Sequence, residues 1–150
     1  MSRSFNSFPS REGRIALITG ANSGIGFDTA KALLDKGFTV ILGCRSLMKA
    51  EIARDKLLNQ TDSERIELLE IDLSDLNAID IAGDRLLDKF KNLDILINNA
   101  GVMAPPRTSS KQDFELQFAV NHLAHMALTL KLLPLLTKKK GSRIVTVSSG

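Results

Sequence analysis

The sequence has no tryptophan, no tyrosine and one cysteine, Cys44, among its 150 residues. Without Trp and Tyr, seven Phe are left as aromatic platforms on which nucleic-acid bases could stack. The net charge of +3 is also too small to attract a polyanion strongly. We therefore expect no nucleic-acid partner. A single cysteine excludes a disulfide within the chain, which favours a reducing compartment, and we expect a cytoplasmic protein.

Long hydrophobic runs are also scarce. No apolar run reaches the roughly 20 residues that a membrane span requires, so no span is expected. Residues 1–14 lack the apolar stretch of a secretory signal, and we interpret them as an N-terminal tail. Residues 15–150 have the length of one domain, and the chain's 43% hydrophobic and 25% charged residues are typical of a globular protein.

Short runs rich in Val, Ile and Leu alternate with helical patterns along this domain. The expected strands are 15–19, 39–44, 65–71, 94–98 and 143–148, and the expected helices are 25–36, 47–59, 75–91 and 111–137. Gly37 is the expected stop of the first helix, Ser74 the expected N-cap of the third, and Pro134 is expected to bend or end the fourth. This alternation predicts an α/β fold, a doubly wound parallel sheet of about five strands in the order 3-2-1-4-5, with helices on both faces.

The turn between the first strand and the first helix carries the strongest functional signal, with the sequence Thr19-Gly-Ala-Asn-Ser-Gly-Ile-Gly26. A glycine-rich turn at this place directs backbone N–H groups and the positive end of a helix dipole to one point, which attracts phosphate. Gly24 lets the backbone approach an anion, and Gly26 lets the helix pack closely on the strand. The alternative is an ordinary tight turn with chance glycines.

Arg45 directly follows the second strand, about 20 positions after the turn, where dinucleotide-binding folds place a ribose-reading residue. An acid there would bind a 2′-hydroxyl, whereas a guanidinium binds a 2′-phosphate in bidentate fashion. Lys49 follows one helical turn later. The sequence therefore predicts NADP(H) rather than NAD(H) as the cofactor. The alternative is that Arg45 only faces solvent at the start of a helix.

Polar residues also follow the third and fourth strands. Asp72 could accept a hydrogen bond from an adenine amino group, although an acid at the start of a helix is the simpler interpretation. Asn98 and Asn99 can donate and accept hydrogen bonds across a gap between strands. Ala100-Gly101 leave room for a flat group beside the backbone. The alternative for this segment is a simple loop.

Asn121 and His122 interrupt the apolar face of the fourth helix, where polar groups need partners. Asn121 is expected to bond a backbone carbonyl or an ordered water. His122 and His125 lack an accompanying Cys or acid cluster, so we interpret them as structural and expect no metal site. Ser149, the second residue of the pair Ser148-Ser149 after the last strand, could bond a carbonyl substrate. No nucleophile-elbow pattern surrounds it, which argues against a hydrolase.

Taken in order, these motifs resemble those of the short-chain dehydrogenase/reductase family, and the resemblance extends from Arg14 onward. Arg45 and the segment Val120-Asn-His-Leu-Ala-His125 are most similar to the branch that contains retinol dehydrogenases and light-dependent protochlorophyllide reductases. The family implies a Rossmann-type fold and an NADP(H)-dependent oxidoreductase that transfers hydride between an alcohol and a carbonyl of a small-molecule substrate. Reduction of a carbon–carbon double bond, as by protochlorophyllide reductases, is the alternative.

The resemblance also implies roles for individual residues. Arg45 would meet the adenosine 2′-phosphate, and Asp72 and Leu73 would meet the adenine. Asn121 matches the helix Asn that supports a water-linked proton relay, and Ser149 matches the Ser that orients the substrate carbonyl. The residues that would cradle the pyrophosphate are Gly20, Asn22, Ser23, Gly24, Ile25 and Gly26, and those beside the ribose and nicotinamide are Asn99, Ala100 and Gly101.

One part of the family pattern is missing, because the proton-transferring Tyr-x-x-x-Lys motif needs a tyrosine and this chain contains none. We therefore expect 15–150 to be an incomplete dinucleotide-binding domain without the C-terminal catalytic and substrate part, inactive on its own. A cofactor-binding or subunit-pairing module without catalysis is the alternative, and the helix 111–137 is the expected contact of a homo-oligomer. The strand 143–148 is expected to remain an uncovered apolar edge.

Overall fold

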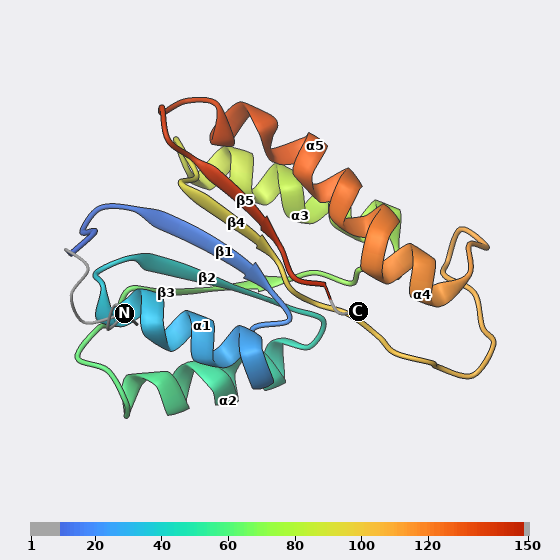
Figure 1. The fold of residues 1–150 in the computed structure, drawn as a ribbon, viewed down its shortest axis with the longest axis horizontal. Coiled ribbons are helices and arrows are strands. Elements are labelled where there is room, and N and C mark those ends of the chain that lie inside the picture. The colour runs from blue at the N-terminus through green and yellow to red at the C-terminus, as the bar shows by residue number, and fades with distance from the viewer. Residues whose placement is uncertain (1–9, 149–150) are drawn as a thin grey trace, which may run out of the picture.

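A five-stranded parallel sheet forms the centre of the computed structural model, which describes residues 10–148. The strands are β1 (Ile15–Thr19), β2 (Thr39–Cys44), β3 (Ile66–Glu70), β4 (Ile95–Asn98) and β5 (Arg143–Thr146). Their spatial order is β3-β2-β1-β4-β5, with β1 in the middle of the sheet (Figure 1). This order confirms the topology predicted from the sequence.

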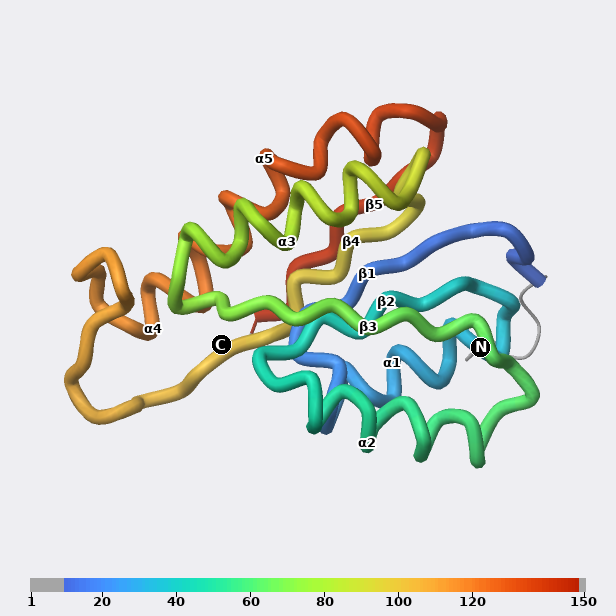
Figure 2. Tube along the Cα trace, turned by 180° about the vertical axis from the view of Figure 1, so that it is seen from behind, coloured from blue at the N-terminus to red at the C-terminus, as the bar shows by residue number. Residues whose placement is uncertain are grey.

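Helices cover the two faces of the sheet, as Figures 1 and 2 show from opposite sides. One face carries α1 (Gly24–Asp35) and α2 (Leu47–Leu58). The other carries α3 (Leu76–Lys89) and a long helix that runs through α4 (Leu116–Phe118), the π-helical turn η2 (Ala119–Leu123) and α5 (Ala124–Leu136). The arrangement is the doubly wound α/β fold that the alternating pattern predicts.

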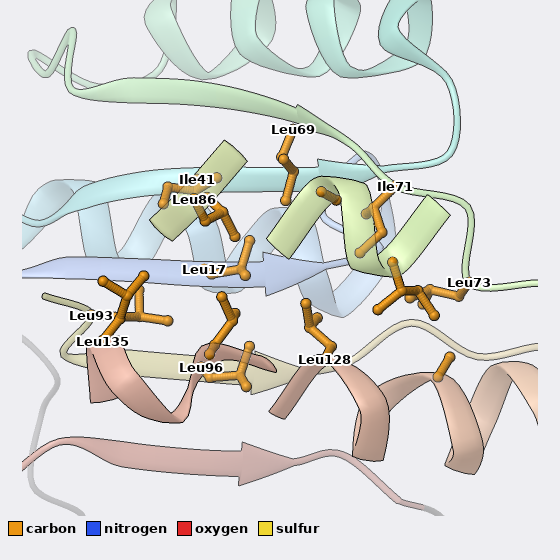
Figure 3. Packing of buried hydrophobic residues seen from close by; sticks show 14 of the residues in the cluster. Leu17, Ile41, Leu69, Ile71, Leu73, Leu86, Leu93, Leu96, Leu128 and Leu135 are labelled. Atoms are coloured by element: carbon orange, nitrogen blue, oxygen red, sulfur yellow. The ribbon is translucent and has the colours of Figure 1, made fainter. Parts of the chain in front are cut away.

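Alternating residues of the strands contribute to two apolar clusters. Leu17 and Ile41 are buried with residues of α3 and α5 (Figure 3). Ile18, Val40 and Leu42 are buried with residues of α1 and α2 on the opposite face. All five side chains are at most 1% exposed. Because both faces of these strands are covered, the strands are apolar throughout rather than alternating in polarity.

The edge strand β5 differs from the strands at the centre of the sheet. It pairs with β4, yet all of its residues are exposed, and Ile144 and Val145 remain 48% and 44% accessible. No element of residues 10–148 buries the side chains of this strand. The predicted uncovered apolar edge is confirmed.

The fourth helix begins later than its pattern predicts. Residues 111–115 form turns and a β-bridge instead of helix, and the first helical residue is Leu116. The Glu115 carboxylate sets this start by accepting a hydrogen bond from the Phe118 amide at 2.7 Å. Pro134 lies inside the last turn of α5, where the helix ends as expected.

The continuous helix Leu116–Leu136 is 21 residues long and, by length and composition alone, apolar enough to cross a membrane. The helix is no continuous apolar run, because it contains Asn121, His122 and Lys131, and the expectation of no membrane span stays a prediction. In this fold 44% of the helix's most apolar 18-residue stretch is buried. The inner face of the helix packs with α3 and the sheet. The core helix of a globular domain passes the same test of length and composition.

The N-cap of α3 is Asp75 rather than the predicted Ser74. The Asp75 carboxylate accepts from an amide of the first turn at 3.0 Å, while the Ser74 hydroxyl donates to Asp72 at 2.7 Å. Hydrogen bonds from Gln112 and Lys111 lower the pKa of Asp75 to about 2. Contacts from the 111–115 segment thus select Asp75 as the cap, and they fix that segment against α3.

Candidate functional site

The candidate site lies at the carboxyl ends of β1 and β4, where the strand order reverses. The chain continues from β1 to β2 and β3 on one side, then crosses to β4 and β5 on the other. Ladder pairing between β1 and β4 stops at Ile18 and Ile97, so the residues beyond them can diverge. A crevice at such a point is where doubly wound folds bind ligands.

Hydrogen bonds from Thr19 and Asn99 bridge the diverging strand ends. The Asn99 carboxamide donates to the carbonyls of Thr19 and Gly20, at 2.9 and 3.4 Å. The Thr19 hydroxyl accepts from the amides of Asn99 and Ala100, both at 3.0 Å. These bonds fix the glycine-rich turn to the loop after β4, and they confirm the predicted use of Asn99 across a gap between strands.

Three glycines shape the turn after β1. Gly20 and Gly24 have φ values of +67° and +54°, in the left-handed region that side chains disfavour. A Cβ on Gly26 would lie 2.4 Å from the Gly20 carbonyl oxygen and 2.6 Å from the Asn99 side-chain nitrogen. Close approach of α1 to the bridge between the strands therefore requires glycine at position 26.

The N-terminus of α1 differs from those of the two helices that follow it. The helix begins at Gly24, one residue before the predicted Ile25, and Ser23 in the cap position makes no side-chain capping bond. In contrast, α2 and α3 are capped by the side chains of Ser46 and Asp75. The first amides of α1 therefore have no side-chain cap, and the positive end of the helix dipole lies there.

Two adjoining cavities open at this crevice, the first of about 410 Å³ and the second of about 340 Å³. The first extends over the ends of β2 and β3, and the second lies over the glycine-rich turn. Their walls contain all the predicted cofactor residues except Gly24. Both walls include Gly20, Asn22, Ala100 and Gly101, the first adds Arg45, Asp72 and Leu73, and the second adds Ser23, Ile25, Gly26 and Asn99.

Arg45 lies at the wall of the first cavity, directly after β2. Its side chain is exposed and has no ion-pair partner among the residues that the structure describes. Lys49, one turn into α2, lines the same cavity. The Ser46 hydroxyl accepts from the Lys49 amide at 3.4 Å, which fixes the start of the helix between the two cations. This wall therefore presents positive charge to the cavity.

Asp72 lines the same cavity and also starts the turn into α3. One of its carboxylate oxygens accepts from the amide and the hydroxyl of Ser74, at 2.9 and 2.7 Å. The interpretation of Asp72 as an acid at the start of a helix is therefore confirmed. The hydrogen bond from an adenine amino group to Asp72 stays a prediction, as does the contact of Leu73 with the adenine.

Asn121 lies in the π-helical turn η2 and faces the loop after β4. Its carboxamide accepts from the Val102 amide at 2.8 Å and donates to the Val102 carbonyl at 2.9 Å. The expected bond to a backbone carbonyl is thus confirmed, while the relay role implied by the resemblance stays a prediction. Ser149, the other predicted catalytic residue, lies outside the described residues.

His125 of α5 is the site residue that the sequence did not indicate. Its buried ring places Nε2 2.9 Å from Thr19 Oγ1 and Nδ1 3.3 Å from the Asn121 carbonyl oxygen. Burial lowers the pKa of His125, which favours the neutral form of the ring. The contact joins residues 106 positions apart, for which no local pattern gives a signal.

Within residues 10–148, no group of three or more His, Cys, Asp and Glu side chains could hold a metal ion.

Comparison with known proteins identifies the family. The model of the short chain dehydrogenase family matches residues 14–150. The chain belongs to the short chain dehydrogenase family. Its members are oxidoreductases that act on small molecules, and their Rossmann-type sheet is the one described above.

Several similar short chain dehydrogenases are known individually. Mouse retinol dehydrogenase 12 is 41% identical over 137 residues, which cover 91% of this chain and 43% of that protein. Mouse retinol dehydrogenase 14 is 44% identical over 148 residues, covering 91% and 44%. The solved structure of Pseudomonas aeruginosa RhlG, an NADP active-site complex, has a TM-score of 0.79 at 27% identity, covering 93% of this chain and 56% of its own. The chain thus spans less than half the length of these two retinol dehydrogenases.

The close approach at Gly26 can be tested by adding a single methyl group. In Gly26→Ala the new Cβ would meet the Gly20 carbonyl and the Asn99 carboxamide, and we expect the free energy of unfolding to fall by about 1–3 kcal/mol, as for other overpacked sites. Urea denaturation measures this change. Asp28→Ala, at an exposed position of the same helix, is the matched control and should change stability by less than about 0.5 kcal/mol. Equal stability of the two variants would contradict the assigned packing.

Proposed function

We propose that the chain binds NADP(H) in the two adjoining cavities, as the cofactor-binding part of a short chain dehydrogenase that transfers hydride between an alcohol and a carbonyl group. The observation that carries this proposal is the placement of Arg45 and the uncapped start of α1 on walls of the same crevice. One feature fits a 2′-phosphate and the other fits a diphosphate, so the two anionic groups of the cofactor each have a counterpart.

The diphosphate is assigned to the glycine-rich turn. Backbone amides at the start of α1 can donate to its oxygens, and the helix dipole favours its negative charge. Asn22, Ser23, Ile25 and Gly26 line the cavity at this point. The open space around Gly24, where an added Cβ would meet no atom within 4 Å, leaves room for an anion beside the backbone.

The 2′-phosphate is assigned to Arg45. An unpaired guanidinium at the wall of a cavity can donate two parallel hydrogen bonds to a phosphate, and Lys49 adds a second positive charge beside it. NAD(H) lacks the 2′-phosphate that this pair would bind. The selection of NADP(H) over NAD(H) predicted from the sequence is thus supported by the position of both cations in one wall.

Hydride transfer also needs a proton and an oriented substrate. The bound cofactor supplies the hydride, and by resemblance Ser149 orients the carbonyl while Asn121 supports the proton relay. The chain contains no tyrosine to act as the phenolic acid. Loss of a positioned acid costs about 10²–10⁴ in rate. We therefore propose that these residues bind the cofactor without sustaining turnover by themselves.

The similar proteins support an alcohol and carbonyl pair as the substrate class. Two of them are retinol dehydrogenases, which favours an alcohol and carbonyl pair over the double bond of the protochlorophyllide alternative. The location of the protein in the cytoplasm stays a prediction.

The role of Arg45 gives a direct test of cofactor choice. Arg45→Ala is expected to weaken NADPH binding by about 10–100-fold, the value of lost charge-assisted hydrogen bonds, and to leave NADH binding unchanged. Fluorescence titration with both reduced cofactors measures the two dissociation constants. Lys56→Ala removes one positive charge from an exposed position of α2 outside both cavities and should change neither. A wild-type chain that binds NADH more tightly than NADPH would overturn the assignment.

We also propose that the chain pairs with a second copy through the long helix. The outer face of α5 exposes Met126, Leu130 and Leu133, which are 53%, 58% and 38% accessible, and apolar side chains grouped on one face favour association. The edge strand β5 is exposed as well.

Pairing can be tested by placing a charge on this face. Leu130→Asp is expected to shift the wild-type dimer to a monomer in sedimentation-velocity runs, because a carboxylate would be buried unpaired in the interface. Lys139→Asp, at an exposed position after the helix, controls for the change of charge and should leave the dimer intact. A monomeric wild-type chain would contradict the proposal.

A further inference from the structure

Thr19 Oγ1 is the point at which three segments of the site meet. The amides of Asn99 and Ala100 lie 3.0 Å from it, His125 Nε2 lies 2.9 Å away, and the Ile97 carbonyl oxygen lies 3.5 Å away. A hydroxyl offers two lone pairs and one hydrogen. Backbone amides can only donate, so they occupy both lone pairs. The hydroxyl hydrogen is therefore directed to the nearer acceptor, the ring nitrogen of His125.

This assignment fixes the tautomer of His125. Because Nε2 accepts from Thr19, a neutral ring has to carry its hydrogen on Nδ1. Nδ1 lies 3.3 Å from the Asn121 carbonyl oxygen, which can only accept. The hydrogen bonds then run in one direction, from the amides after β4 to the Thr19 hydroxyl, from that hydroxyl to the imidazole, and from the imidazole to the backbone carbonyl of Asn121. No member of the chain competes with another for a hydrogen.

Thr19 and Asn121, the two residues that the ring contacts, also hold the two ends of the loop 99–102. The Thr19 hydroxyl holds the amides of Asn99 and Ala100, and the Asn121 carboxamide holds both backbone groups of Val102. Residues of this loop line both cavities. The His125 ring thus contacts both residues that hold this loop, through the hydroxyl of Thr19 and through the backbone carbonyl of Asn121.

We propose that His125, as the Nδ1–H tautomer, is a positioning residue that presets the loop 99–102 for the cofactor. The inference rests on the proposed NADP(H) site and adds to it a residue outside both cavity walls. His125 is 5% exposed, so the proposed action passes through Thr19 and Asn121. The lowered pKa of the buried ring agrees with a neutral imidazole.

The tautomer can be measured on the wild-type chain without any ligand. Long-range ¹H–¹⁵N correlation spectra distinguish a protonated ring nitrogen from an unprotonated one, and only two histidines contribute signals, because the chain contains two. We expect His125 to show a protonated Nδ1 and an unprotonated Nε2 at pH 7. A ring protonated on Nε2 would overturn the proposal whatever the chain binds.

Two substitutions separate positioning from filling of space. His125→Leu removes the acceptor and leaves the Thr19 hydroxyl without its nearer partner, so we expect NADPH to bind about tenfold or more weakly. His125→Gln offers a carboxamide oxygen as acceptor near the place of Nε2 and should keep the dissociation constant within about threefold of wild type. His122→Leu is the control on the same helix, because His122 is exposed and stacks on Phe118, and it should leave binding unchanged.

The outcomes distinguish this inference from the function on which it rests. A wild-type chain that binds no NADPH overturns the proposed function and this inference together. If folded His125→Leu binds NADPH as tightly as the wild-type chain does, this inference alone is overturned. Weak binding by both His125→Leu and His125→Gln, with both folded by circular dichroism, would mean that ring shape matters rather than the acceptor, and it would also overturn the proposal.

Discussion

The ends of β1 and β4 have to separate to admit a ligand and yet remain fixed to one another, and the hydrogen bonds of Thr19 and Asn99 satisfy both requirements. The pairing between β1 and β4 stops one residue before Thr19. Beyond it, a hydroxyl and a carboxamide make bonds at 2.9–3.4 Å to backbone groups of the opposite segment. Side chains can span a wider gap than backbone groups, so a crevice forms without the loss of a rigid frame.

The other parts of the site are placed by reference to this bridge. Gly26 has no side chain because the Gly20 carbonyl and the Asn99 carboxamide occupy the space that a Cβ would need. Helix α1 can therefore begin against the bridge, with its uncapped amides beside the second cavity. Arg45 reaches the same crevice because β2 pairs in register with β1 and ends beside it. A turn, a helix start and a cation from separate segments thus surround one space.

The sequence predicted those features whose causes are local. Buried parallel strands need apolar residues on both faces, which is why the central strands could be located. The glycines of the turn and Arg45 after β2 were found from spacing alone. In contrast, the start of the long helix depends on the Glu115 carboxylate, and the cap of α3 depends on contacts of Asp75 with residues more than 30 positions away. The bond between Thr19 and His125 likewise depends on the folded arrangement.

The central claim is that the backbone amides of the glycine-rich turn bind the diphosphate of NADPH while Arg45 binds its 2′-phosphate. Titration of the ¹⁵N-labelled chain with NADPH, followed in amide correlation spectra, tests it most directly. The account predicts saturable shifts of the amides from Gly20 to Gly26, with further shifts at Arg45 and Asn99–Gly101, and smaller effects from NADH at the same concentration. Unchanged signals for these residues in a folded chain at millimolar NADPH, or shifts confined to other surfaces, would contradict it.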